Sequence, residues 1–237
     1  MDITLIGYGK MGKAIEAVAL ERKHRIVLKI DVDNPNEFTR ENLQQSQVAI
    51  EFTSPLTAFD NVMQCLRYDV PVVSGSTGWY GRLNEAKELC MARNGSMLCA
   101  SNFSPGVNIF FELNRTLARL MAKFPDYHAS IEEIHHTRKL DAPSGTAITL
   151  AEGILDEIPD LQRWEQDGEA PDVLPIRSIR EGNVTGTHTV KYASAIDDLE
   201  IIHTAHSRQG FALGAVMAAE FIHDRKGIFS MKHLLGI

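Results

Sequence analysis

The first hundred residues alternate short apolar runs with longer segments in which apolar positions recur every three or four residues. Five runs are rich in β-branched and aliphatic side chains, as buried strands are: residues 2–6, 25–30, 47–53, 70–74 and 96–100. Three segments between them have the spacing of amphipathic helices: residues 13–20, 55–68 and 83–94. This alternation predicts a Rossmann-type, doubly wound parallel sheet with helices on both faces.

From about residue 104 the pattern changes, and strand-like runs follow one another with fewer helices between them. Helical spacing covers residues 108–123 and 143–158, and the polar stretch 159–175 predicts a long loop. The strand-like runs are residues 127–136, 176–180, 186–194 and 199–206. Such grouping predicts an α+β domain with a mostly antiparallel, open sheet.

The last long helical pattern, residues 210–223, has a small, alanine-rich face. A face of that kind is expected to pack closely against other elements, here against the first domain. We therefore expect a dinucleotide-binding domain made of residues 1–103 and completed by residues 208–237. Residues 104–207 would then form a second domain that binds substrate and forms the oligomer.

The first strand runs directly into a glycine-rich turn. Gly7, Gly9 and Gly12 form a G-x-G-x-x-G, a helical pattern follows, and the second strand ends at Asp31. In dinucleotide-binding proteins such glycines permit the tight turn and a close approach to the pyrophosphate, while the acid binds ribose hydroxyls. Strand, glycines, helix, strand and acid in this order predict a nicotinamide cofactor.

The same element bears on the choice of cofactor. Asp31 favours the free 2′-hydroxyl of NADH, and no arginine follows it to hold a 2′-phosphate. Lys10 and Lys13 could reach that phosphate from the glycine loop, or they could be solvated side chains at a helix start. We expect both NADH and NADPH to be used, with NADH at least as good.

Three loops leave the carboxyl ends of the predicted parallel strands, at residues 7–12, 52–55 and 75–78. Ligands of doubly wound sheets bind at those ends, so all three loops are candidates to border the cofactor. The alternative for the third loop is that Gly75 and Gly78 serve tight turns only.

Composition excludes several classes of protein. Among the 237 residues, 44% are hydrophobic and 23% charged, which is ordinary for a globular protein. A net charge of −7 argues against a nucleic-acid binder, and no apolar run approaches the roughly 20 residues of a membrane span. The three cysteines show no C-x-x-C spacing, and the chain opens on a strand pattern, so we expect a cytoplasmic protein with reduced thiols.

Residues 132–147 read EEIHHTRKLDAPSGTA and combine acid–base groups with the start of a helix. His135 and His136 end a strand-like run, and Lys139 follows them. A histidine titrates near neutral pH, and a helix start presents free N–H groups to anions. The segment therefore predicts a site that holds a carboxylate-bearing substrate and protonates it.

The helix start itself is the predicted carboxylate site. Ser144, Gly145 and Thr146 follow Pro143, a residue favoured in the first helical turn. Their N–H groups and hydroxyls are expected to bind one carboxylate of the substrate, although serine and threonine here can also cap the helix without any ligand. Asp141 is expected to be structural, either capping the helix or orienting Lys139. No histidine has metal-ligand spacing to a cysteine or carboxylate, so we expect no metal.

With these motifs in hand, the chain resembles the dihydrodipicolinate reductases of bacterial lysine biosynthesis along its whole length. The string H-H-x-x-K-x-D-A-P-S-G-T at residues 135–146 is highly specific to that family. Two departures bear on the cofactor site: Glu51 stands where an aspartate before Phe-Thr is usual, and no arginine follows Asp31.

The resemblance implies NAD(P)H-dependent reduction of a cyclic imine with two carboxylates, 4-hydroxy-tetrahydrodipicolinate or its dehydrated form, to tetrahydrodipicolinate. It implies that His135 is the general acid, that Lys139 assists it, and that His136 contacts the substrate. It also implies a homotetramer formed through open sheet faces. Further cofactor contacts that it implies are Lys10, Met11, Phe52, Thr53, Gly75, Thr77, Ser101, Asn102 and Phe103.

Two other hypotheses stay open. One is another NAD(P)-dependent reductase with two domains, such as an amino-acid dehydrogenase, but those enzymes lack a His-His-x-x-Lys string before a Ser-Gly-Thr helix start. The other is a regulatory module that senses NADH without turnover, and it leaves His135 and Lys139 without a purpose. Turnover with substrate separates both from the reductase.

Overall fold

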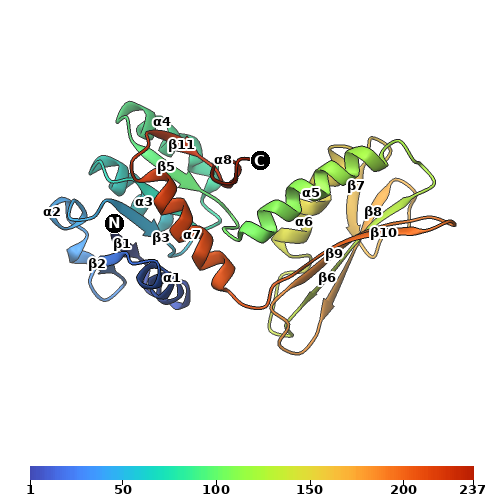
Figure 1. The fold of residues 1–237 in the computed structure, drawn as a ribbon, viewed down its shortest axis with the longest axis horizontal. Coiled ribbons are helices and arrows are strands. Elements are labelled where there is room, and N and C mark those ends of the chain that lie inside the picture. Colours follow the sequence, from blue (N-terminus) through green and yellow to red (C-terminus); the bar gives the residue numbers. More distant parts are fainter. The chain divides into compact units, whose positions relative to one another are not determined.

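The chain forms two compact units, one built on a six-stranded sheet and the other on a five-stranded sheet (Figure 1). The computed structural model describes residues 1–237. The first unit consists of Met1–Pro105 and Gln209–Ile237, so the chain leaves it and returns, and the second is Gly106–Arg208. No helix has both the length and the apolar character needed to span a bilayer.

All strands of the first sheet are parallel, in the order β11-β5-β4-β3-β1-β2, which confirms the predicted doubly wound sheet. Five of them coincide with the apolar runs of the sequence. Strands buried on both faces form such runs, and β1, β3, β4 and β5 are largely buried, while the edge strand β2 is mostly half-buried or exposed. The strands are β1 (Asp2–Ile6), β2 (Arg25–Ile30), β3 (Val48–Glu51), β4 (Val72–Ser74), β5 (Ser96–Cys99) and β11 (Gly227–Phe229).

Helices cover both faces of this sheet (Figure 1). Val48 and Ile50 of β3 join the core under α1 and α7, whereas Ala49 joins the core under α3 and α4, because successive strand side chains point to opposite faces. The helices are α1 (Lys10–Glu21), α2 (Arg40–Leu43), α3 (Ala58–Arg67), α4 (Leu83–Ala92), α7 (Gln209–Ile222) and α8 (Met231–Leu235).

The alanine-rich helix α7 packs on the first sheet, beside α1. At Gly214 the contact is so close that a Cβ atom would lie 1.7 Å from the carbonyl oxygen of Phe103. The small residues of α7 therefore let the returning chain lie directly against the segment that follows β5.

The second sheet has the order β10-β9-β6-β8-β7 and is mixed, not mostly antiparallel as predicted. Strand β9 is antiparallel to both neighbours, while β6, β8 and β7 run parallel. Strands β6 and β8 are parallel because the chain passes through α6 and β7 before it reaches β8, and a helical crossover joins parallel strands. The strands are β6 (His128–His135), β7 (Arg163–Gln166), β8 (Val173–Arg180), β9 (Thr187–Ala193) and β10 (Asp198–Thr204).

Strand β7 lies within the stretch 159–175, which the sequence predicted to be a loop, so that prediction was wrong there. The four residues of β7 are mostly polar and lie at the edge of the sheet, so they carry no apolar run or alternation. Helices α5 (Pro105–Met121) and α6 (Gly145–Leu155) pack side by side on one face of this sheet (Figure 1).

Candidate active site

In the first unit, the glycine loop and the loops after β3 and β4 meet at the carboxyl end of the sheet. Gly7 has a φ of 92°, and a Cβ there would lie 2.1 Å from the carbonyl oxygen of Phe52. A Cβ at Gly75 would lie 2.1 Å from the ring of Phe52, and one at Gly12 would lie 2.2 Å from the carbonyl oxygen of Gly7. Gly9, by contrast, has nothing within 4 Å of that position and precedes α1, so the helix start is open to a ligand.

A cavity of about 450 Å³ adjoins this loop, between the ends of β1, β2 and β3. Gly7, Gly9, Asp31, Phe52 and Thr53 line it. Its position is the switch point of the sheet, where the paired strands β1 and β3 are followed by helices on opposite faces, and a dinucleotide fits there by its pyrophosphate and ribose chemistry.

The remaining wall of the cavity bears on cofactor choice. Val32, Pro35 and Phe38 supply an apolar surface beside Asp31, and neither a lysine nor an arginine lines the cavity. The ammonium of Lys13 lies 5.9 Å from the ring centre of Tyr8. The lining of the cavity thus contains one acid, Asp31, and no lysine or arginine.

The other residues predicted to contact the cofactor do not line this cavity. Phe103 is buried, and its ring lies 5.6 Å from the ring of Phe52, which it supports. Asn102 turns its side chain back to accept a hydrogen bond from the N–H of Ser104 at 2.9 Å. The rest lie outside the cavity as well: Lys10, Met11, Gly12, Gly75, Thr77 and Ser101.

A buried carboxylate joins two of these loops. Glu51 accepts hydrogen bonds from the N–H of Thr53 at 2.9 Å and from the hydroxyls of Thr53, Ser74 and Ser76 at 2.5, 2.5 and 2.7 Å. Because the four bonds come from the loop after β3 and from the end of β4 and its loop, Glu51 fixes the position of Thr53 relative to Gly75. From the sequence, Glu51 was visible only as a departure from the usual aspartate.

The second unit contains a second buried carboxylate, at the centre of a polar cluster. Glu133 on β6 is fully buried; both its oxygens lie 3.1 Å from the backbone nitrogen of Ser144. Its Oε1 also accepts bonds from the Ser178 hydroxyl at 2.8 Å and the Arg180 guanidinium at 3.0 Å. Burial alone would raise the pKa of Glu133, but the contacts from His135, Ser144, Ser178 and Arg180 outweigh it and hold that pKa well below the usual range. Glu133 is therefore an anion.

Two histidines face this carboxylate. His135 Nδ1 lies 3.3 Å from Glu133 Oε2, and His188 Nε2 lies 3.7 Å from the same oxygen and 3.1 Å from the Ser144 hydroxyl. The two imidazole rings are 5.0 Å apart, edge to face. Burial, and next to it the neighbouring His135, lowers the pKa of His188 to about 4, so His188 is neutral at pH 7.

The helix start is built differently from the prediction. Helix α6 begins at Gly145, two residues later than predicted, because Ser144 is its N-cap and Pro143 lies before it. The Ser144 hydroxyl accepts a hydrogen bond from the N–H of Ala147 at 3.2 Å, and its own N–H is bound to Glu133. Ser144 thus has the capping role that was the alternative for this trio. Gly145, which comes next, is exposed, and Thr146 is half-buried.

The remaining predicted residues of this segment lie on the turn after β6. The strand ends at His135, which is buried, and the chain turns at the half-buried His136. The Lys139 ammonium binds both carboxylate oxygens of Asp141, at 2.8 and 2.7 Å. Asp141 therefore orients Lys139 and does not cap the helix.

The cluster includes a trio that could hold a metal ion. Donor atoms of Glu133, His135 and His188 all lie within 4.8 Å of one another. The sequence did not reveal this grouping because it forms between neighbouring strands, with Glu133 of β6 opposite His188 of β9. Both oxygens of Glu133 already accept N–H or O–H donors, and Arg180 supplies the positive charge, so the contacts favour an ion-pair network over a metal site.

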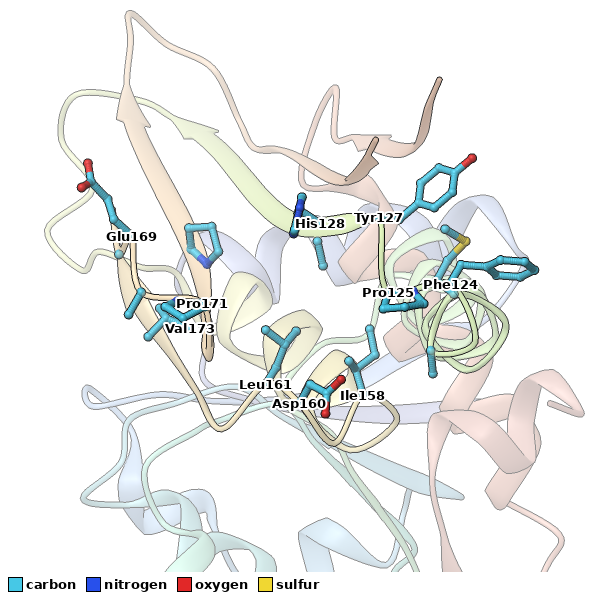
Figure 2. Close-up of a pocket in the computed structure, with 16 residues that line it drawn as sticks. Phe124, Pro125, Tyr127, His128, Ile158, Asp160, Leu161, Glu169, Pro171 and Val173 are labelled. Carbon is cyan, nitrogen blue, oxygen red and sulfur yellow. The ribbon is translucent and has the colours of Figure 1, made fainter. Parts of the chain in front are cut away.

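Another cavity of the second unit, of about 480 Å³, shares no lining residue with the cluster (Figure 2). Phe124 and Pro125 lie on one side of it, and Pro171 and Val173 lie on the other. No predicted site residue lines it, so it has no part in the site described here.

Comparison with known proteins shows which family the chain is similar to. A family model described as "Dihydrodipicolinate reductase, N-terminus" matches residues 1–103, and one described as "Dihydrodipicolinate reductase, C-terminus" matches residues 106–235. The chain is 52% identical over 235 residues to the 4-hydroxy-tetrahydrodipicolinate reductase of Christiangramia forsetii, covering 99% of this chain and 98% of that one. It is 32% identical over 230 residues to the enzyme of that name from Neisseria gonorrhoeae, covering 94% and 84%.

A solved structure agrees in fold. The dipicolinate-bound dihydrodipicolinate reductase from Paenisporosarcina sp. TG-14 superposes with a TM-score of 0.78, at 22% identity and over 97% of each chain. The likeness covers both units.

Proposed function

Because the chain belongs to the dihydrodipicolinate reductase family, we propose that it is an oxidoreductase that converts 4-hydroxy-tetrahydrodipicolinate, or its dehydrated form, to tetrahydrodipicolinate. The observation that carries the proposal is the relative of that name, which is 52% identical over 99% of this chain. The reaction belongs to the diaminopimelate and lysine pathway. NADH or NADPH is the cofactor, and when bound it supplies the hydride.

The first unit is the proposed cofactor domain. Its support is the cavity at the switch point, which combines the open start of α1 at Gly9 for the pyrophosphate with Asp31 for ribose hydroxyls. Around it, Glu51 holds the two neighbouring loops in place. The proposed contacts are Gly7, Gly9, Lys10, Met11, Gly12, Asp31, Phe52, Thr53, Gly75, Thr77, Ser101, Asn102 and Phe103.

The second unit is the proposed substrate domain. His135 gives the proton as general acid, since it ends β6 with its Nδ1 3.3 Å from the Glu133 carboxylate. Lys139 lies on the turn that leads to α6 and stabilises developing negative charge. His136 contacts the substrate, and the start of α6 at Ser144, Gly145 and Thr146 binds a carboxylate. Within that trio the direct contacts are proposed for Gly145 and Thr146, because the N–H of Ser144 is bound to Glu133 and its hydroxyl to the N–H of Ala147.

The test is a coupled assay that follows the absorbance of reduced nicotinamide. A dihydrodipicolinate synthase makes the unstable substrate from pyruvate and aspartate semialdehyde while this protein and NADH or NADPH are present. Loss of absorbance that requires both proteins supports the reductase. Binding of NADH without such loss would favour the sensor hypothesis, and reduction of a keto acid with ammonia would favour an amino-acid dehydrogenase.

Replacing Asp31 with serine should shift the cofactor preference toward NADPH. The change removes charged hydrogen bonds to the ribose and relieves repulsion of a 2′-phosphate, so the Kd for NADH should rise about tenfold while that for NADPH falls. Fluorescence titration with both cofactors measures the ratio. Asp33→Ser is the matched control because Asp33 is exposed and does not line the cavity. An equal shift in both variants would remove Asp31 from cofactor selection.

The second sheet supports a homotetramer. Ile201 of β10 packs toward α5 and α6, so the alternation of the strand places Ile202, which is 59% exposed, on the face that these helices leave uncovered. Ile202→Glu should therefore dissociate the assembly in sedimentation velocity. Met91→Glu on α4, also an exposed apolar position, should leave it intact. A tetramer that survives Ile202→Glu would contradict this interface.

The absence of disulfide bonds between the cysteines supports a cytoplasmic location. Cys65, Cys90 and Cys99 are all free, and a reducing compartment keeps them so. Two of the three are buried, which fits packed, inert side chains.

A further inference from the structure

We propose that Glu133 is the positioning residue for the general acid of this site. Its carboxylate holds His135 with the Nδ1 proton toward Glu133 and joins that ring to the substrate-binding start of α6. The inference rests on the proposed function, in which His135 gives the proton to the substrate.

The contact between the two side chains sets the tautomer of His135. Glu133 and His135 lie on the same face of β6, and Nδ1 is 3.3 Å from Oε2, a close electrostatic contact that is not aligned as a hydrogen bond; Nδ1 has no other partner. A carboxylate anion only accepts hydrogen bonds, so it favours a proton on Nδ1 whether the ring is charged or neutral. Nε2 is then the nitrogen that gives up a proton to the substrate, as when a second group fixes the tautomer of a catalytic or metal-bound histidine.

The surroundings of Nε2 agree with this assignment. A Cβ atom at Gly186 would lie 3.0 Å from His135 Nε2 and 3.2 Å from its Cδ2. The backbone next to Nε2 therefore belongs to a glycine, Gly186, which has no side chain that could cover this nitrogen. The ring of His188 lies edge to face with that of His135, and its Nε2 lies 3.1 Å from the Ser144 hydroxyl.

The same carboxylate also sets the position of the helix start. Both oxygens of Glu133 lie 3.1 Å from the backbone nitrogen of Ser144, the N-cap of α6. Arg180 donates to Glu133 at 3.0 Å and to the carbonyl oxygen of Asp141 at 2.6 Å. Since Asp141 binds Lys139, the Glu133–Arg180 pair connects the acid, the lysine and the anion-binding helix start.

The test is Glu133→Gln, which keeps the size of the side chain but removes its charge. An amide can donate as well as accept, so the proton of a neutral His135 ring is no longer held on Nδ1. We expect kcat to fall by about 10–100-fold, the usual worth of a residue that orients another, with the KM for NADH unchanged. In ¹⁵N NMR spectra His135 should change from the Nδ1–H tautomer to a mixture of the two.

Ser178→Ala is the matched control, since it removes another hydrogen bond to Glu133 and leaves the charge in place. A merely structural role predicts that both variants lower the melting temperature and neither changes kcat or the tautomer. If Glu133→Gln does not fold, Glu133→Asp is tested in its place. The shorter side chain keeps the charge beside Arg180 but moves the carboxylate oxygens away from His135. In that variant kcat should still fall several-fold, whereas an unchanged kcat would overturn the inference.

The two proposals fail in different ways. Absence of turnover by the unchanged protein in the coupled assay would overturn the proposed function. An unchanged tautomer of His135 together with an unchanged kcat in Glu133→Gln would overturn the role of Glu133, whatever the substrate. The NMR measurement needs neither substrate nor turnover.

Discussion

Replacing His135 with glutamine should lower kcat by about 10²–10⁴-fold, the usual contribution of a well-placed general acid. Glutamine has nearly the reach of histidine and also offers an N–H group to Glu133, but it cannot deliver a proton near neutral pH. Because His135 lies in the second unit, NADH binding to the first should be unchanged. The coupled assay gives kcat, and fluorescence titration gives the Kd for NADH.

His128→Gln is the control for this variant. His128 starts the same strand, β6, but is exposed and lines the separate cavity of Figure 2. Its replacement should leave kcat within about twofold of the unchanged protein. If the His135 variant turned over as fast as the control, His135 would have no part in proton transfer, and Lys139 would be the next candidate.

Gly7→Ala should weaken cofactor binding by about two orders of magnitude. The residue has a φ of 92°, which strains any side chain, and the new Cβ would lie 2.1 Å from the carbonyl oxygen of Phe52. Backbone atoms cannot yield as a flexible side chain can, so the loop after β1 must move away from β3. Overpacking of this kind costs about 3 kcal/mol, which corresponds to a roughly 100-fold higher Kd for NADH.

Gly81→Ala is the matched control, because a Cβ at Gly81 has nothing within 4 Å and its φ is not positive. It should bind NADH like the unchanged protein and melt at a similar temperature. The measurement is a fluorescence titration with NADH alongside thermal unfolding. Tight NADH binding by a folded Gly7→Ala variant would show that the glycine loop does not hold the cofactor.

The first sheet was predictable because its information is local. Parallel strands buried on both faces appear as continuous apolar runs, and a run such as residues 2–6 followed by glycines and a helix leaves few other folds. The pairing of the second sheet was not predictable, since strand direction depends on which strands become neighbours. Strand β7 was missed because an edge strand of four mostly polar residues has no signal in the sequence.

The candidate site divides in the same way. His135, Lys139 and the helix start occur in one string of residues, so the sequence brings them together. Glu133 and His188 are 55 positions apart in number but opposite one another in the register of β6 and β9, and only that register joins them. The sequence does show that Glu133 and His135 are two residues apart in a strand and therefore lie on the same face. It gives no such indication for His188.

Ser144 shows the limit of motif chemistry. The sequence offers its hydroxyl and N–H as substrate contacts or as a cap, and both fit a serine that opens a helix. The structure places the N–H on Glu133 and the hydroxyl on the N–H of Ala147. Glu133, eleven positions earlier, occupies the N–H of Ser144 and so decides which N–H groups remain for a ligand. No local sequence pattern reveals this contact.

The most direct test of the central claim is the fate of the hydride. The coupled mixture would be run with NADH that carries deuterium at the transferable position, and the dicarboxylate product analysed by mass spectrometry. The reductase function predicts one deuterium on a ring carbon of each tetrahydrodipicolinate molecule, in a yield that requires this protein. An unlabelled product, or bound NADH that is never oxidised, would contradict it.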